Sequence, residues 1–199
     1  MALLTKRKIL GIVNKPHDLM GFMSPIIIRL KAAYRDLFKV EPALDWDDVV
    51  SSEKQAEWTQ LLGLLSSAKA VKFPRATRPK NAIGKPELVG YFDGSDNAYA
   101  AVIYYRWNLS DGSIEVRLAC SNARVTPLKR ISTPRAELNG AVLLTRLTLN
   151  LVKALAKSGR APAKVWFFGD SECALVSIDK TNNALGEYFR HRCAKIHSN

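Results

Sequence analysis

The spacing of apolar residues changes along the chain from a helical period to a strand-like period. Before residue 72, two stretches repeat apolar residues at three- and four-residue spacing, one opening at Ser24-Pro25 and one opening at Ser51 or Ser52. A capping hydroxyl, with Pro at the first helical position in one case, is typical of a helix start. The first stretch predicts an amphipathic helix of about four turns, and the second predicts another that carries Trp58 and Leu65.

Strands are predicted beyond the stretch from Phe73 to Pro86, which is rich in Pro and Arg. Three runs follow at residues 88–93, 98–107 and 114–121. In the third run, apolar side chains alternate with others in the two-residue period of a half-buried strand. Asp111-Gly112 supplies turn chemistry between the last two runs. We therefore predict three antiparallel strands in chain order.

A long helix and a fourth strand are predicted next. Thr133-Pro134 opens a helix through about Lys157 whose apolar residues cover so much of its circumference that we expect it to be largely buried. Val165 to Phe168 is a continuous apolar run, which predicts a central strand buried on both faces. Shorter helices are expected after Ser171 and over 184–196. This order predicts a mixed α/β fold with the fourth strand parallel to its neighbour.

Charge and cysteine content narrow the possible partners and compartments. Lys and Arg number 30 against 18 Asp and Glu, giving a net charge of +12 that both halves of the chain share, and such a balance favours nucleic acid. An odd count of three distant cysteines fits a reducing compartment. Since no apolar run is long enough to span a bilayer, we expect no membrane association and a location in the cytoplasm, or in the nucleus if the protein follows nucleic acid there.

Three acidic residues occupy notable positions in the predicted order. Asp93 ends the first strand, Glu137 lies in the first turn of the long helix, and Asp170 ends the fourth strand. Each alone has a simple structural explanation, as a turn residue, a first-turn helix acid or a helix cap. Together they can converge, because adjacent strands end side by side and a helix crosses the sheet. Clustered carboxylates favour Mg²⁺ or Mn²⁺.

The motifs of nearly the whole chain resemble the Pao/BEL family of LTR retrotransposons. From Leu88 onward the chain resembles the family's ribonuclease-H-like domain, and the preceding part resembles the segment that joins it to the reverse transcriptase. The matching motifs are Lys6-Arg7-Lys8-Ile9-Leu10-Gly11-Ile12, Asp18-Leu19-Met20-Gly21-Phe22-Met23-Ser24-Pro25, Trp46-Asp47, Phe73-Pro74-Arg75, Phe92-Asp93-Gly94-Ser95, Ala98-Tyr99, Val125-Thr126-Pro127-Leu128, Thr133-Pro134-Arg135-Ala136-Glu137-Leu138 and Asp170-Ser171.

The resemblance implies two-metal hydrolysis of the RNA strand of an RNA–DNA hybrid. Two Mg²⁺ or Mn²⁺ ions about 3.5 to 4 Å apart activate a water and stabilise the leaving oxygen in such sites. Asp93 is expected to contact both ions, with Glu137 and Asp170 on either side. The implied partners are the hybrid, or another nucleic acid, and the reverse transcriptase palm region of the same polyprotein. Candidate contacts to backbone phosphates are Arg124, Lys129, Arg130 and Arg135.

The resemblance also predicts the organisation of the chain. We expect a helical connection segment over 1–72, a linker over 73–87 and a ribonuclease-H-like domain over 88–199, with a truncated βββαβα order. Domains of this type carry a fourth carboxylate after a fifth strand, and the sequence ends before both. Activity of the chain is therefore expected to be impaired.

Two alternative functions compete with the nuclease. A non-catalytic nucleic-acid-binding or connection module would keep the carboxylates as relics. The third alternative is an aspartic-type polyprotein peptidase, since this region of the family has also been described as a Pao retrotransposon peptidase. Known aspartic peptidases use Asp-Thr-Gly or Asp-Ser-Gly, whereas this chain has Asp-Gly-Ser at Asp93 and Asp-Ser-Glu at Asp170.

Overall fold

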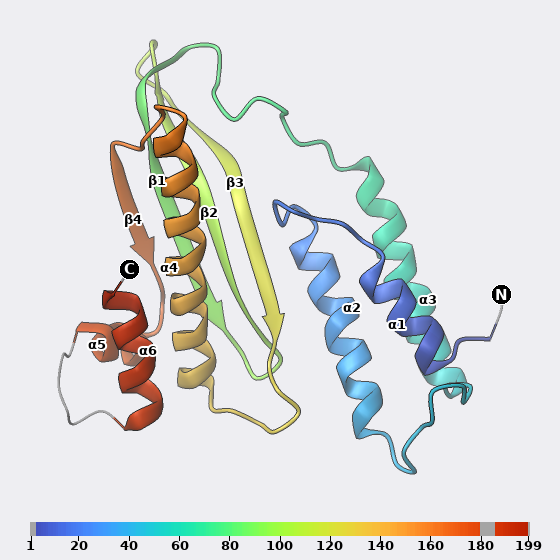
Figure 1. The fold of residues 1–199 in the computed structure, drawn as a ribbon. Helices are drawn as coiled ribbons and strands as arrows, with labels where there is room; N and C mark the ends of the chain where they lie inside the picture. The colour runs from blue at the N-terminus through green and yellow to red at the C-terminus, as the bar shows by residue number, and fades with distance from the viewer. Residues whose placement is uncertain (1–2, 180–185, 199) are drawn as a thin grey trace.

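A four-stranded mixed sheet organises the chain from residue 82 onward (Figure 1). The computed structural model describes residues 3–179 and 186–198. Three antiparallel strands follow one another, and a fourth lies parallel to the first after a helical crossover. The elements are β1 (Ala82–Gly94), β2 (Ala98–Leu109), β3 (Ile114–Val125), α4 (Thr133–Lys157) and β4 (Lys164–Phe168), and the sheet order is β3-β2-β1-β4. The predicted mixed α/β fold class and strand order are confirmed.

The first strand begins earlier than its apolar pattern indicates. Residues Ala82 and Ile83 already pair with Leu109 and Asn108 of β2, and the pairing then shifts register before it resumes at Glu87. The shift contains Pro86, which has no N–H to donate to a neighbouring strand. Because this irregularity interrupts the two-residue period, the strand extends unnoticed into the stretch predicted as linker. The division at 72 and 87 stays a prediction.

The fourth strand is present, but its predicted burial on both faces is wrong. β4 lies at the edge of the sheet and pairs only with β1 among the described strands. All five of its residues are exposed, and the aromatic side chains from Trp166 to Phe168 are 45–48% accessible. A continuous apolar run shows that a strand has two apolar faces, whereas burial depends on which elements cover them.

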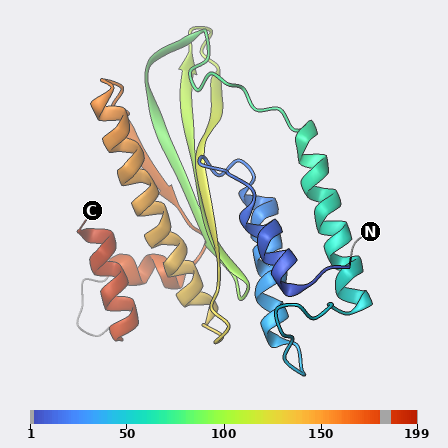
Figure 2. The same cartoon turned by 45° about the vertical axis from the view of Figure 1, so that its right-hand side comes forward.

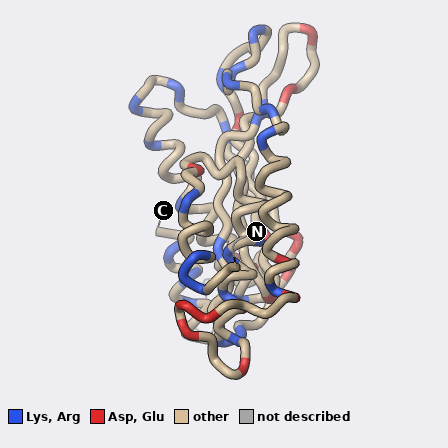
Figure 3. Tube along the Cα trace, turned by 90° about the vertical axis from the view of Figure 1, so that its right-hand side faces the viewer, with Lys and Arg blue, Asp and Glu red and all other residues tan. Residues whose placement is uncertain are grey.

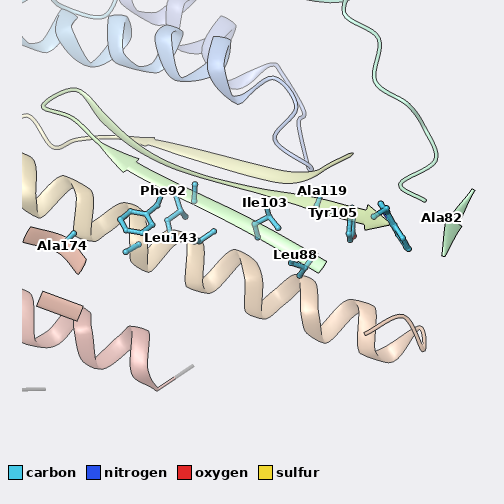
Figure 4. Close-up of a cluster of buried hydrophobic side chains, with 12 residues drawn as sticks. Ala82, Leu88, Phe92, Ile103, Tyr105, Ala119, Leu143 and Ala174 are labelled. Carbon is cyan, nitrogen blue, oxygen red and sulfur yellow. The ribbon is translucent and has the colours of Figure 1, made fainter. Parts of the chain in front are cut away.

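The core of the sheet lies under α4 (Figure 4). Leu88 and Ile103 from the strands are fully buried, and Leu144 of α4 is 1% exposed. The buried residues of α4 run from Ala136 to Thr148, whereas its last turns are exposed or half-buried. The expectation that the whole helix is largely buried therefore holds only as far as Thr148, whereas Leu151, Val152 and Leu155 beyond it are partly buried against the core.

Three helices before the sheet form a second core. Trp58, Ile9 and Leu30 have no measurable exposure there. Helix α1 was not predicted, although four of its nine residues are apolar after three consecutive basic ones. The Asp18 carboxylate accepts hydrogen bonds from the N–H groups of Phe22 and Met23 ahead of the predicted Ser24 helix. The helices are α1 (Lys6–Asn14), α2 (Ser24–Asp36) and α3 (Ser52–Ser67), with 3₁₀ turns at Leu37–Lys39 and Ala68–Ala70.

The helical segment packs on the face of the sheet opposite α4 (Figure 2). Arg35 of α2 is only 8% exposed and reaches the loop residue Asn97 and Thr126 beyond β3. At the β3 edge, the Ser121 N–H donates to Met20 O at 2.8 Å and the Ser121 hydroxyl donates to Gly21 O at 2.6 Å. These polar contacts fix the helices against the sheet near the end that carries Asp93.

Two short helices complete the described chain beside α4. They are α5 (Glu172–Asp179) and α6 (Glu187–His197). The predicted helix over 184–196 corresponds to α6, and residues 184–185 lie outside the described part. Among the described residues, no helix is long and apolar enough to cross a membrane.

Candidate metal centre and nucleic-acid interface

The ends of β1 and β4 place Asp93 and Asp170 on one edge of the sheet. The two strands are parallel, with Tyr91 of β1 paired to Phe168 of β4, and each aspartate lies two residues beyond that pair. Both side chains are exposed, and both residues line the same open pocket of about 400 Å³ together with Tyr91 and Phe168. The sequence prediction that these two acids meet at a strand end agrees with this placement.

Glu137 reaches the same corner from the first turns of α4. A Cβ on Gly94 would lie 2.3 Å from the Glu137 nitrogen, so the main chain that follows Asp93 touches the start of the helix. The half-buried Glu137 carboxylate accepts a hydrogen bond from the Ser171 hydroxyl. Ser171 directly follows Asp170, and its Oγ also accepts from the Ala174 N–H at 3.1 Å, as expected of a helix cap. One side chain thus links Glu137 to the segment that carries Asp170.

The acids share a corner without forming a closed ligand cluster. Asp93 Oδ1 accepts a hydrogen bond from the Gly94 N–H at 2.6 Å, and Glu137 is bound by Ser171. Within residues 3–179 and 186–198, no three Asp, Glu, His or Cys side chains are grouped closely enough to hold a metal ion. The donor chemistry, three carboxylates, suits hard cations such as Mg²⁺ and Mn²⁺. The main chain brings the acids together, whereas oxygens of Asp93 and Glu137 accept hydrogen bonds from local donors.

The four basic candidates are in different surroundings. Arg130 forms an ion pair with Asp96, and the guanidinium of Arg135 lies 4.7 Å from the centre of the Tyr188 ring. Lys129 is exposed. Arg124 lines a small pocket between the sheet, α4 and α6. Lys and Arg are spread over the length of the molecule rather than gathered in a tail (Figure 3).

Sequence reasoning missed the partners that these residues meet in space. Ser171 was expected only as a cap, and nothing in its local sequence indicates the contact with Glu137. Arg146 and Arg192 accompany Arg124 in its pocket although they lie on α4 and α6. The spacing of Asn139, Val142 and Arg146 on one helical face was the available signal, but it does not show which element lies opposite.

Two solved ribonuclease H structures are similar to part of the chain. The N-terminal RNase H domain of a Mycobacterium tuberculosis protein, solved as a fusion with maltose-binding protein, is 13% identical, with a TM-score of 0.39 over 57% of this chain and 73% of that one. RNase H1 of Halobacterium salinarum is 16% identical, with a TM-score of 0.33 over 56% of this chain and 75% of that one. No curated protein sequence matches the chain.

A third solved structure matches over nearly the whole length of the chain. It is the foamy viral protease-reverse transcriptase in complex with double-stranded DNA, at 15% identity and a TM-score of 0.30. The match covers 98% of this chain and 33% of that one.

The sheet order and the helical crossover are those of a mixed α/β domain of the ribonuclease-H-like class. The family comparison gives its origin. Residues 5–171 match the family described as Pao retrotransposon-like RNaseH-like domain, and the chain belongs to this family. The match begins before α1, so the family includes the helical segment as well as the sheet. RNase H-like domains generally use divalent metal ions.

Proposed function

We propose that this domain hydrolyses the RNA strand of RNA–DNA hybrids, with Asp93, Glu137 and Asp170 as its catalytic metal ligands. The observation that supports this proposal most is the meeting of three acids from separate elements at one corner of the sheet. Asp93 and Asp170 line one pocket, and Ser171 joins Glu137 to the Asp170 segment. We propose Mg²⁺ or Mn²⁺ as the cofactor, because all three donors are carboxylates.

Each acid has a distinct part in this proposal. Divalent ions bound here would supply an activated water and neutralise the charge on the leaving oxygen. Asp93 stands between the other two acids, since β1 touches both β4 and the start of α4, so we assign it the shared position. The Ser171 hydroxyl holds the Glu137 carboxylate in place. The exposed side chains of Asp93 and Asp170 have room to turn toward a cation.

The basic surface supports nucleic acid as the substrate class. With a net charge of +12, the chain attracts polyanions through counterion release. We assign phosphate contacts to Arg124 and Lys129, with Arg130 and Arg135 more constrained by Asp96 and Tyr188. The reverse transcriptase palm region of the same polyprotein is the proposed protein partner, and the cytoplasm or nucleus the proposed location.

A cleavage assay with matched variants tests the proposal. The chain is incubated with a hybrid labelled on its RNA strand and with Mg²⁺ or Mn²⁺. We expect the wild type to cleave the RNA strand, and Asp93→Asn and Asp170→Asn each to reduce the rate by at least about 100-fold. Each substitution removes a ligand of the cation that would stabilise the negative charge of the transition state. Glu172→Gln is the control, since it removes an exposed acid next to the site and should retain the wild-type rate.

Metal binding gives a second readout that does not depend on turnover. Mn²⁺ titration followed by electron paramagnetic resonance should show binding that weakens in Asp93→Asn, Glu137→Gln and Asp170→Asn but not in Glu172→Gln. Equal Mn²⁺ affinity in all four variants would contradict the assigned ligands. Cleavage of a polyprotein-like peptide that an aspartic-peptidase inhibitor blocks would replace the nuclease with the peptidase.

A non-catalytic nucleic-acid-binding module is the second candidate. It is favoured by the engagement of Asp93 and Glu137 with local donors and by the lack of a closed metal cluster among the described residues. This alternative predicts salt-sensitive binding of the hybrid without cleavage. It also predicts that Asp93→Asn binds the hybrid more tightly, because a negative charge is removed from the surface.

A further inference from the structure

A small basic pocket lies between β3, α4 and α6, at a different place from the three acids. Its volume is about 140 Å³, and none of its lining residues lines the pocket of Asp93 and Asp170. Four cationic side chains from the three elements surround it. The lining residues include Arg124 of β3, Asn139 and Arg146 of α4, and Arg192 and Lys195 of α6.

The three arginines of this pocket form no ion pair with an acid in the described part of the chain. No Asp or Glu is among the described residues that line it. The exposed side chains of Arg124 and Arg146 form no ion pair and no hydrogen bond within the described part of the chain. Glu187 of α6 does not line the pocket and lies 3.5 Å from His191. Like charges around one small volume repel each other, so an anion that enters the pocket is favoured.

Neutral groups hold one of the arginines in a defined orientation. Arg192 Nε donates to Asn139 Oδ1 at 2.6 Å, and the Tyr188 hydroxyl donates to the same oxygen at 3.1 Å. The Arg192 guanidinium also stacks on the Tyr188 ring, 3.5 Å from its centre. These contacts orient Arg192 without cancelling its charge. A planar guanidinium fixed in this way can donate two parallel hydrogen bonds to a phosphate.

We propose that this pocket binds a backbone phosphate of a nucleic-acid strand. Its volume is below the range of pockets for drug-sized ligands, which suits a single phosphate group rather than a nucleoside. Arg124, Arg146 and Arg192 are the residues that contact the phosphate, and Lys195 adds positive charge. The identity of the polyanion rests on the proposed function, whereas the anion site itself stands on the pocket.

The pocket and the acids can engage one strand. Arg146 follows Glu137 by nine residues on α4, which is about 14 Å along a helix axis at 1.5 Å per residue. That distance corresponds to a few nucleotides of a backbone. A strand whose phosphate is held by the pocket would therefore extend along α4 toward Asp93 and Glu137, so the pocket would set how far from the bound phosphate the strand is cut.

Binding of a fluorescent RNA–DNA hybrid, without divalent cations, tests the proposal separately from catalysis. The full chain carries Arg124→Gln with Arg146→Gln, two exposed residues whose loss should leave the fold intact. The matched control is Lys153→Gln with Lys157→Gln, which removes the same charge from exposed positions on α4 outside the pocket. We expect about tenfold weaker binding in the pocket variant, and a slope of log K against log salt that is smaller by about 1, because one phosphate contact is lost. The control should lose less than about threefold.

Three results would overturn the proposal. The first is equal affinity and equal salt slope in the pocket variant and its control. The second is displacement of the probe from the wild type by inorganic phosphate while the pocket variant binds hybrid normally, which would show a site for the free ion. The third is equal affinity of the wild type for polyglutamate and for the hybrid, with loss of polyglutamate binding in the pocket variant. This result would indicate an acidic protein partner.

One further double variant keeps the test informative. Arg124→Lys with Arg146→Lys retains the charge and removes the forked donors, so it should bind with intermediate affinity. If the glutamine pair lowers the melting temperature, the lysine pair is compared with the wild type instead. Wild-type affinity in the lysine pair would contradict bidentate phosphate binding by Arg124 and Arg146. A wild-type chain that binds the hybrid through the pocket but does not cleave it would contradict the proposed function and would not contradict the phosphate pocket.

Discussion

The two edges of the sheet differ in the contacts that they make with the rest of the chain. At the β3 edge, Ser121 donates hydrogen bonds from its N–H to Met20 O and from its hydroxyl to Gly21 O, so the loop before α2 covers the edge at this residue. Within the described residues no strand pairs with the outer edge of β4, and all five β4 residues are exposed, among them Trp166 at 45% and Phe167 at 48%. An uncovered edge offers unpaired N–H and C=O groups to other chains. The helical segment therefore stabilises one side of the sheet only, and association with other molecules is expected at the other side.

Arg35 should be the most sensitive position at the covered edge. Its guanidinium donates to Asn97 O, Thr126 O and Thr126 Oγ1 at 2.8 to 3.3 Å. We expect Arg35→Met to lower the free energy of unfolding by about 3 to 5 kcal/mol, because buried acceptors lose a charged partner. Chemical denaturation measures this change. Arg29→Met, on the same helix, is the control, and an equal effect of both would contradict a special role for Arg35.

Gly21 should be the next most sensitive position. Its φ is +76°, and a Cβ would lie 1.8 Å from Ser121 O. Gly21→Ala is expected to cost about 2 to 3 kcal/mol, since both the backbone conformation and the approach to β3 become strained. Amide hydrogen exchange should then show faster exchange of the Ser121 N–H. Gly63→Ala, on α3 with open space around it, should leave this amide unchanged.

The open edge should tolerate substitution with little change in stability. Val165 is 41% exposed on β4, so Val165→Lys should change the free energy of unfolding by less than about 1 kcal/mol. A lysine on an edge strand disfavours edge-to-edge pairing. Sedimentation velocity at rising concentration should therefore show less self-association than in the wild type or in Val165→Thr. Greater self-association in the lysine variant would be inconsistent with an open β4 edge.

The smallest expected effect is the pH dependence of the covered edge. Burial raises the pKa of the Asp36 carboxyl, but hydrogen bonds from Lys39 and Arg35 outweigh burial and the net pKa is lowered. A lowered folded-state pKa gives stability above the usual aspartate pKa, and this stability is lost as the pH falls through the folded pKa. The free energy of unfolding should therefore fall more below about pH 4 in the wild type than in Asp36→Asn, by less than about 1 kcal/mol because the group is partly exposed. Chemical denaturation at several pH values measures this difference.

The order of the elements from β1 onward could be predicted from the sequence, since local periodicity and caps determine it, whereas α1 was not predicted. Burial could not, because it depends on neighbours that are distant in the chain. The apolar run from Val165 to Phe168 reads the same at the centre of a sheet as at its edge, and β4 lies at the edge. The site divides in the same way. The positions of Asp93, Glu137 and Asp170 were inferred from the predicted strand ends and the predicted first helical turn. The contact of the Ser171 hydroxyl with Glu137 and the grouping of Arg146 with Arg192 are known only from the three-dimensional structure.

The close approach at Gly94 has a mechanical consequence for the corner that holds the acids. A Cβ on Gly140 would lie 2.8 Å from Asp93 O, and one on Gly94 would lie 2.3 Å from the main chain of α4, so strand and helix touch without side chains between them. The separation of Asp93 and Glu137 is thus set by two backbones in contact. Core substitutions farther along α4 would change the tilt of the helix about this contact. The main-chain separation of Asp93 and Glu137 would change little.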